Sequence, residues 1–453
     1  MTATLQVASP ETPLKHTTNC KTETYQSWGR YPRVAHRHVS KVYWRDQLLD
    51  GLRCAEPASL LPYGLGRSYG DSCLNENRDL LDCSPLNRIL GFDWETGLIR
   101  VEAGISLGDL LEVIVAHGWF LPVTPGTKFV TIGGAIANDI HGKNHHRAGT
   151  FGCHVRRITL YRSDTGVLEC SPSRNAGLFS ATIGGLGLTG IIGCADLQLK
   201  PIAGNAIAVS TLPFDSLDGF HDVSATSDST HEHTVAWIDC FSGTHTRGIF
   251  FRGNHTDKNL RHRTAQHAIP FPLPERILNR AAVALFNRYY YARNARKQDS
   301  AIVHYDPFFY PLDGIRNWNL LYGKRGLVQY QCVLPTSSAD TMKSIVEVIS
   351  KAGEGCFLAV LKAFGHIKSP GLLSFPRPGL TLALDLPMRG RRTFALLDAL
   401  DELVLQSGGA LYPAKDARMP PKIFNAGFPN WTEFARFIDP KLSSSFWRRV
   451  ITE

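Results

Sequence analysis

The 453-residue sequence contains no long apolar run. No stretch reaches the ~18 consecutive apolar residues that a membrane-spanning helix needs. Residues 1–20 also have no apolar segment of the kind found in secretory signals. These absences argue against helical membrane spans and predict a protein that is cytoplasmic or held peripherally at the inner membrane.

Paired metal-binding motifs are also missing. The ten cysteines include no Cys-x-x-Cys pair, which argues against a zinc knuckle or a redox dithiol. Scattered cysteines in a chain of this length are typical of a reducing compartment, where they act as small core residues. The His-rich run at residues 141–146 has no carboxylate or cysteine pattern to complete a site, so no metal is predicted.

The sequence has no RNA- or DNA-binding motif to accompany its basic charge. Lys and Arg number 49 against 40 Asp and Glu, which gives a net charge of +9 with His neutral. Such an excess suits anionic lipid, nucleic acid or an acidic substrate, and it also occurs in ordinary basic enzymes. Without a motif, no nucleic-acid partner is predicted.

The common nucleotide-binding motifs are absent or out of place. The Gly-Lys-Ser/Thr ending of a P-loop does not occur. Residues 185–190 (GLGLTG) match the letters of the Rossmann dinucleotide fingerprint, but a strand-like run at residues 191–199 follows where a helix is required. A bound dinucleotide would therefore need a different architecture.

The remaining patterns predict an α+β fold. Residues 98–103 alternate as a strand does, and Ser106 opens a helix that Gly118 ends. Further along, the order is strand, helix, strand, strand, helix, at residues 329–335, 341–352, 357–364, 380–386 and 393–406. That order predicts an antiparallel sheet with helices on one face.

Changes in residue composition and in the pattern of apolar residues divide the chain into four parts. We predict a flexible N-terminal tail (1–24), a first domain (25–203), a second domain (204–408) and a C-terminal segment (409–453). The second domain has a basic aromatic insertion near residues 255–300. Within it, residues 276–296 predict an amphipathic helix with a cationic face. This helix is either an ordinary exposed helix or lid, or a contact with a membrane surface or a lipid substrate.

Four Gly-rich segments lie within about 130 residues, a density that turns alone do not explain. They are residues 64–71 (GLGRSYGD), 125–127 with 131–135 (PGT, TIGGA), 138–146 (NDIHGKNHH) and 184–192 (GGLGLTGII). Glycine permits close backbone approach, and successive backbone N–H groups can then surround an anion such as a pyrophosphate. The set favours a dinucleotide site.

These segments resemble known flavoproteins. The first two resemble the FAD-binding domain of the vanillyl-alcohol-oxidase, or PCMH-type, superfamily. More narrowly, the chain resembles the decaprenylphosphoryl-β-D-ribose 2-oxidase family. That likeness is carried by residues 135–146, 151–152, 184–192, 309–313, 318–319, 329–331, 362, 364 and 412–418.

The resemblance implies an activity and partners. It implies a PCMH-type FAD-binding domain of two α+β subdomains, with a substrate domain whose antiparallel sheet lies above the flavin. The implied reaction moves a hydride from a secondary alcohol carbon of a sugar, prenyl-phosphate linked in this family, to flavin N5. A short-chain NAD(P)H-dependent reductase would complete an epimerisation to arabinose for cell-envelope polysaccharide, with quinone or oxygen as electron acceptor and peripheral membrane contact.

The resemblance also implies site residues. The catalytic candidates are Lys415, His141 and Tyr69, and the substrate-binding candidates are Lys143, Gln329, Gln331, Lys362, Phe364 and Lys415. The FAD-binding candidates are Gly64, Leu65, Gly66, Arg67, Ser68, Tyr69, Gly70, Asp71, Gly126, Thr131, Ile132, Gly133, Gly134, Asn138, His141, Gly142, Ile192 and Tyr412.

Three points stay open at the level of sequence. Arg67 occupies the place of the His that binds flavin covalently in many superfamily members, so non-covalent FAD is predicted. Thr381 and Ala383 replace the Asn and Cys of familiar family members, which leaves the exact sugar open. Lys415 is either a base or a hydroxyl-orienting or electrostatic group, and Asp416 would favour its charged form if the two side chains met.

Two other functions fit the sequence less well. An aldonolactone or alditol oxidase that uses oxygen belongs to the same superfamily, although such enzymes often carry the covalent flavin His. A flavin-binding scaffold that docks at a membrane would use the basic aromatic segment.

Overall fold

Local sequence determines the first elements of the fold. The computed structural model describes residues 25–452 except 243–245, 263–266, 298–299 and 355. In it, strand β5 (Leu98–Glu102) is followed by helix α2 (Leu107–Ile114). The Ser106 hydroxyl accepts from the backbone N–H of Asp109 at 3.0 Å, which caps α2 as predicted. The helix tightens into a 3-10 turn before Gly118, whose φ of 79° ends it.

The N-terminal half contains two sheets. Strands β1 (Val39–Lys41), β3 (Asp79–Asp82) and β2 (Leu60–Tyr63) form a small parallel sheet beside helix α1 (Gln47–Cys54). An antiparallel sheet has the order β4-β5-β9-β7-β8, where the new strands are β4 (Ile89–Asp93), β7 (Val155–Arg162), β8 (Gly166–Cys170) and β9 (Ile191–Gln198). Strand β9 directly follows residues 185–190, which confirms that these glycines do not open a Rossmann helix.

Short helices lie between these strands. They are α3 (Ile132–Ala137), α4 (His145–Ala148) and α5 (Ala176–Thr182). Strands β6 (Trp119–Phe120) and β10 (Lys200–Pro201) pair with each other at the end of this half.

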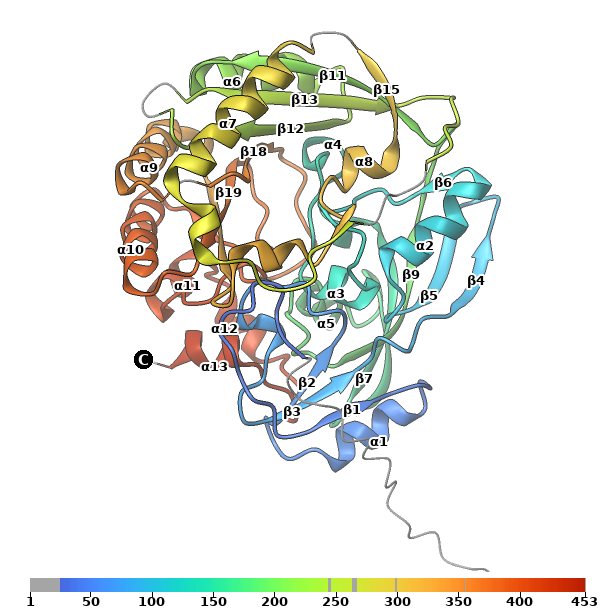
Figure 1. Cartoon of the computed structure of the whole chain (residues 1–453). Coiled ribbons are helices and arrows are strands. Elements are labelled where there is room, and N and C mark those ends of the chain that lie inside the picture. The colour runs from blue at the N-terminus through green and yellow to red at the C-terminus, as the bar shows by residue number, and fades with distance from the viewer. Residues whose placement is uncertain (1–24, 243–245, 263–266, 298–299, 355, 453) are drawn as a thin grey trace, which may run out of the picture.

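The second half is built on one eight-stranded antiparallel sheet. Its order is β15-β11-β13-β12-β18-β19-β17-β20. The strands are β11 (Ala206–Phe214), β12 (His233–Ile238), β13 (Gly248–His255), β15 (Ala301–His304), β17 (Leu327–Leu334), β18 (Ala359–Phe364), β19 (Gly379–Pro387) and β20 (Ala410–Leu411). Helices α6 (Leu217–Asp228), α9 (Ala339–Ala352) and α10 (Arg391–Gln406) cover its outer face (Figure 1). The predicted α+β fold with an antiparallel sheet flanked by helices is confirmed.

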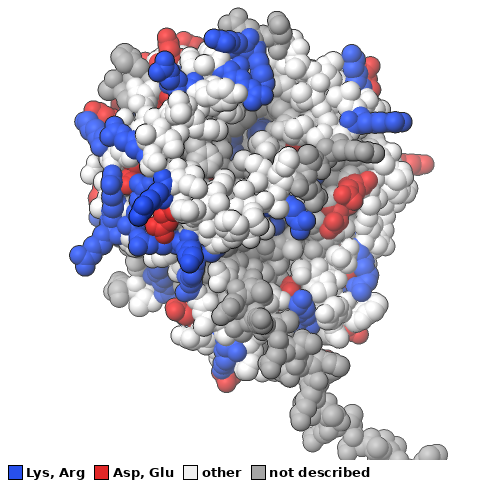
Figure 2. Space-filling view, in the orientation of Figure 1, with Lys and Arg blue, Asp and Glu red and all other residues white. Residues whose placement is uncertain are grey.

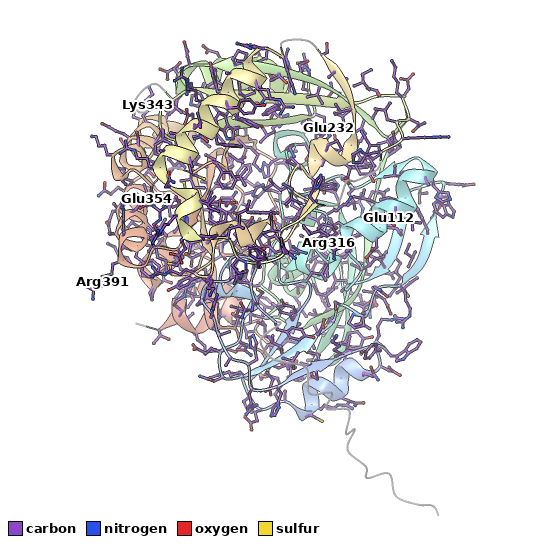
Figure 3. All side chains as sticks on the ribbon, viewed as in Figure 1. Glu112, Glu232, Arg316, Lys343, Glu354 and Arg391 are labelled. Carbon is purple, nitrogen blue, oxygen red and sulfur yellow. The ribbon has the colours of Figure 1, made fainter. Side chains whose placement is uncertain are left out.

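Apolar packing fixes these helices on the sheet. In α9, Met342, Ile345, Val346 and Ile349 are fully buried, as their spacing predicts. Burial of each such side chain contributes about 1.5–3 kcal/mol relative to exposure. Arg391 of α10 lies at the edge of the molecule (Figure 3), and Lys343 of α9 forms an ion pair with Asp218 of α6 at 3.1 Å.

Helix α7 (Arg280–Ala295) crosses the opposite face of this sheet (Figure 1). The helix predicted over residues 276–296 is interrupted near its start. Residues Glu275–Leu278 form a 3-10 turn, and α7 begins only after Asn279, whose side chain caps the helix by accepting from the N–H of Ala282. Helix α8 (Tyr305–Phe309) follows, and strands β14 (His267–Ala268) and β16 (Ile315–Arg316) form a short parallel pair.

The C-terminal segment contacts both halves. Strand β20 extends the large sheet, helices α11 (Pro421–Gly427) and α12 (Trp431–Ala435) follow, and α13 (Ser445–Ile451) packs against the 3-10 turn at Asp71–Cys73. The division at residues 25–203, 204–408 and 409–453 stays a prediction, and the predicted tail lies outside the described residues. No helix in the described part of the chain is long and apolar enough to cross a membrane.

Candidate active site

A cavity of about 690 Å³ lies between the Gly-rich loops and the eight-stranded sheet. All four Gly-rich segments contribute to its lining, together with strands β11, β12, β17, β18 and β19 and the loop that follows β20. The predicted site residues that line it are Gly64, Leu65, Gly66, Arg67, Ser68, Tyr69, Gly126, Thr131, Gly133, Gly134, Asn138, His141, Gly142, Lys143, Ile192, Gln329, Gln331, Lys362, Tyr412 and Lys415.

Four other predicted residues lie behind the lining. Ile132 is fully buried in the core, and Phe364 packs against the His141 ring with centroids 4.8 Å apart. Asp71 forms an ion pair with Arg449 at 2.7 Å. Gly70 leaves no room for a side chain, since a Cβ there would lie 1.6 Å from the Asp416 carbonyl oxygen. These residues support the lining and do not face the cavity.

The glycines allow the loops to pack closely and still leave an open space. At Gly64 a Cβ would lie 2.6 Å from the Thr131 hydroxyl oxygen, so only glycine lets the first loop meet the start of α3. At Gly126, by contrast, a Cβ would meet nothing within 4 Å. The cavity lining at this point is bare backbone, as binding of a dinucleotide requires.

Arg67 provides a second observation that fits an anionic cofactor. Its guanidinium lies 4.2 Å from the ring centroid of Trp28 and 5.3 Å from that of Phe129, and its buried Nε has no hydrogen-bond partner among the described residues. A buried cationic N–H without an acceptor is costly unless a ligand supplies one. An Arg also cannot form the covalent link that a His forms, which favours non-covalent FAD.

The alternation of the sheet brings the polar strand residues together. Successive strand residues face opposite sides, so Gln329 and Gln331 of β17 face the cavity while Tyr330 and Cys332 enter the core. Gln329 pairs with Asp385 across to β19. The sequence did not decide which face Lys362 takes, and the structure places it in the cavity lining.

Three lysines from separate elements meet at this cavity. Lys143 follows α3, Lys362 lies on β18 and Lys415 follows β20. Burial, then the ammonium groups of Lys143 and Lys415, lower the pKa of Lys362 to about 7. Burial also lowers the pKa of Lys143 and of Lys415 to about 8. Such a cluster favours an anionic group in the cavity.

His141 is held as a neutral imidazole between two neighbours. Lys362 Nζ lies 3.1 Å from its Nδ1, and the terminal amide of Gln331 lies 2.9 Å from its Nε2. Burial first, and then nearby Lys362, lower the pKa of His141 well below its usual value. The Gln331 amide nitrogen can only donate, so His141 Nε2 accepts from it; a neutral imidazole then carries its hydrogen on Nδ1, which faces the Lys362 amine.

A second polar group surrounds Lys415. Its Nζ lies 4.0 Å from the ring centroid of Tyr69, which is a cation–π distance. Gln329 donates to the buried carboxylate of Asp385, whose other oxygen has no hydrogen-bond partner in the described structure. Burial raises the pKa of Asp385 to about 7, while Gln329 and Lys415 oppose the shift.

Asp385, and not Asp416, is therefore the carboxylate near Lys415. Asp416 instead accepts from Arg449 at 2.9 Å and from the backbone N–H of Met419. Asp385 is not among the site residues that the sequence predicted. Its one signal was an Asp within an otherwise apolar strand, which becomes informative only when the register with Gln329 is known.

Comparisons with known proteins agree with this geometry. The model of the FAD binding domain family matches residues 45–171. The decaprenylphosphoryl-β-D-ribose oxidase of Mycolicibacterium smegmatis is 36% identical over 398 residues, which cover 83% of this chain and 85% of that protein. The chain belongs to the decaprenylphosphoryl-β-D-ribose oxidase family.

Other relatives show how far the likeness extends. An uncharacterised protein of Streptomyces coelicolor is 33% identical over 76% of this chain and 100% of its own length. The L-gulonolactone oxidase of Mus musculus is 37% identical over 124 residues, or 27% of this chain. As a member of the decaprenylphosphoryl-β-D-ribose oxidase family, the chain is an FAD-dependent oxidoreductase, and FAD as its cofactor is confirmed.

Proposed function

We propose that the protein oxidises the 2-hydroxyl of a polyprenyl-phosphoryl ribose to the ketone. The observation that carries the proposal is the convergence of Lys143, Lys362 and Lys415 on the cavity that the Gly-rich loops line. The cluster supplies positive charge for a phosphorylated substrate and an amine for its hydroxyl. The Mycolicibacterium smegmatis relative is named as an oxidase of decaprenylphosphoryl-β-D-ribose, a compound of this class.

FAD, when bound, supplies the hydride acceptor at N5. The Gly-rich loops and Arg67 would hold it against the sheet. The residues of the chain then have to place the carbinol carbon, remove the hydroxyl proton and exclude water.

Lys415 is the proposed acceptor of the hydroxyl proton. With its pKa lowered to about 8 by burial, a useful fraction of the amine is neutral near physiological pH. The ammonium that forms is stabilised by the nearby Asp385 carboxylate and by the face of the Tyr69 ring. Lys415 and Asp385 thus act as one titrating pair.

Lys362 and Lys143 are the proposed ligands of the phosphate. Lys362 Nζ hydrogen-bonds His141 Nδ1, and Lys143 Nζ donates to the Phe309 carbonyl at 2.9 Å, so both amines are already positioned. Neutral His141 and the Gln331 amide then orient the ribose hydroxyls through neutral hydrogen bonds.

The apolar end of the cavity suits a prenyl chain. It is lined by Val209, Val235, Trp237, Phe251 and Val360 of the sheet. A free sugar would leave these side chains without a partner. The likeness to L-gulonolactone oxidase is confined to 124 residues, so it gives no comparable support for a free-sugar oxidase.

The further steps are proposed from family membership. A short-chain NAD(P)H-dependent reductase would return the opposite configuration at C2, which completes an epimerisation of ribose to arabinose. Quinone or oxygen would reoxidise the flavin, and the enzyme would work peripherally at the inner membrane.

The test is anaerobic flavin reduction of the purified holoenzyme by farnesyl-phosphoryl ribose. We expect bleaching of the flavin absorbance with this compound and none with its 2-deoxy analogue. Bleaching by free aldonolactones or alditols, and none by the prenyl-phosphoryl ribose, would contradict the proposal and identify the sugar-oxidase alternative.

A further inference from the structure

Helix α7 turns polar side chains inward and several large apolar side chains outward. Its buried side chains are Val283, Asn287, which is 0% exposed, and Asn294. Its outward side chains include Leu285 at 70%, Tyr289 at 60% and Phe286 at 43% exposure. A surface helix ordinarily turns its apolar residues inward, and exposed apolar side chains that gather on one helix face are typical of an interaction surface.

The inward polar residues are fixed in place. The Asn287 amide donates to Asp239 at 2.9 Å and to the Cys356 carbonyl at 3.3 Å, and Tyr290 packs against Trp237 with ring centroids 4.8 Å apart. These contacts set the rotation of α7 about its axis. Leu285, Phe286 and Tyr289, here called the outward stripe, are therefore held on the outer side of the helix, where one side of the Phe286 ring still contacts the rings of Tyr290 and Phe357.

Basic residues flank the outward stripe. From Arg276 to Lys297 the sequence has five Arg, one Lys and no Asp or Glu. None of these six forms an ion pair with a carboxylate among the described residues. Figure 2 shows blue side chains near both ends of the course that α7 takes in Figure 1, with mostly white atoms between them.

The inner side of α7 borders the cavity. Tyr290, Asn294 and Lys297 line it opposite Val235 and Trp237 of β12. The outward stripe is therefore separated from the apolar end of the cavity only by the thickness of one helix.

We propose that the outward stripe docks α7 onto a bilayer containing anionic lipid, where the apolar end of the cavity receives the lipid chain of the substrate directly. Exposed Leu, Phe and Tyr enter the acyl boundary, and the Arg side chains meet anionic headgroups. The part that concerns the lipid chain rests on the proposed function. The docking of the outward stripe on the bilayer does not depend on the proposed function.

The test is sedimentation of the full-length holoenzyme with phosphatidylcholine vesicles that contain or lack phosphatidylglycerol. We expect binding to the anionic vesicles and at least about tenfold weaker binding of the variant Leu285→Ser/Phe286→Ser/Tyr289→Ser. The control variant Ile89→Ser/Val167→Ser removes exposed apolar residues from edge strands β4 and β8 and should bind like the wild type.

Two outcomes would overturn the proposal. One is equal binding by wild type and the outward-stripe variant. The other is a wild-type protein that binds neither kind of vesicle but dimerises through the outward stripe. Sedimentation velocity of the wild type and the outward-stripe variant would show such a dimer.

A substrate assay separates this proposal from the proposed function. The outward-stripe variant should reduce flavin normally with water-soluble farnesyl-phosphoryl ribose and slowly with a long-chain substrate held in vesicles. If no prenyl-phosphoryl ribose bleaches the wild type while vesicle binding persists, the substrate assignment fails and the docking surface stands.

Discussion

At the scale of single residues, the proposed chemistry depends on amines that the fold keeps away from bulk water. A Lys with its ordinary pKa of ~10.4 is a poor base at neutral pH, because almost all of it is protonated. Burial in the cavity lining lowers the pKa of Lys415 to about 8, and Asp385 opposes the shift. Burial and the Asp385 carboxylate together thus set the pKa of the Lys415 amine.

Removal of this amine should stop the chemistry and leave the cofactor. We expect Lys415→Met to lower the rate of flavin reduction by about 10²–10⁴-fold, the usual contribution of a positioned base. The flavin content of the purified variant should equal that of the wild type. A variant that keeps FAD and reduces it at the wild-type rate would show that Lys415 is not the acceptor.

The pH dependence tests the Lys415–Asp385 pair. Activity needs the neutral Lys415 amine, so kcat at saturating substrate, where the bound phosphate favours the charged forms of Lys143 and Lys362, should rise with pH through the Lys415 pKa of about 8. Asp385→Asn removes the negative charge that raises that pKa, so the rising limb should move to lower pH, by on the order of one unit. A limb that moves to higher pH would contradict the assigned contact.

The open space at Gly126 tests where FAD lies. Apart from its two chain neighbours, a methyl group there meets no atom of the described residues within 4 Å, so Gly126→Ala should leave the stability of the apoprotein unchanged. If the loop lines the FAD site, the same methyl should weaken FAD binding, as measured by titration of apoprotein with FAD. Gly91→Ala, at a similarly open glycine on strand β4, is the control and should bind FAD normally.

At the scale of elements, helix α13 fixes the first Gly-rich segment through one guanidinium. Arg449 pairs with Asp71 at 2.7 Å and with Asp416 at 2.9 Å, and both carboxylates are buried. Arg449→Gln leaves two buried acids without their cation, so the free energy of unfolding should fall by about 3–5 kcal/mol.

A solvent-exposed ion pair provides the comparison for Arg449. The charged groups of Lys422 and Glu402 lie 3.6 Å apart and both side chains are exposed. Lys422→Ala should lower the free energy of unfolding by only about 0–1 kcal/mol. Urea denaturation of the holoenzyme measures both this effect and that of Arg449→Gln. Equal effects of the two substitutions would show that α13 does not anchor the segment.

Elements with a clear period were predictable from sequence. The apolar spacing of α9 and the Ser106 cap of α2 are local features, and both are confirmed. The direction of Lys362 was not predictable, because its neighbours on β18 are apolar on both faces. The break at Asn279 was missed because a side-chain cap inside a basic run gives no change in periodicity.

At the scale of the whole molecule, pairing between distant segments determines the site. Strand β20, near the end of the chain, pairs with β17 and so carries Lys415 to the cavity, while β18 and β19 bring Lys362 and Asp385. Such register is set by contacts far apart in sequence, which explains why Asp385 became recognisable only in the structure. Family resemblance supplied the other residues.

The central claim is that this one cavity sets a sugar C2–H against the flavin while Lys415 takes the hydroxyl proton. The most direct measurement is the rate of anaerobic flavin reduction by farnesyl-phosphoryl ribose deuterated either at C2 or at C3. Deuterium at C2 should slow the bleaching through a primary isotope effect, and deuterium at C3 should leave the rate unchanged. Bleaching that is insensitive to deuterium at C2 but slowed by deuterium at C3 would place the oxidation at another carbon and contradict the account.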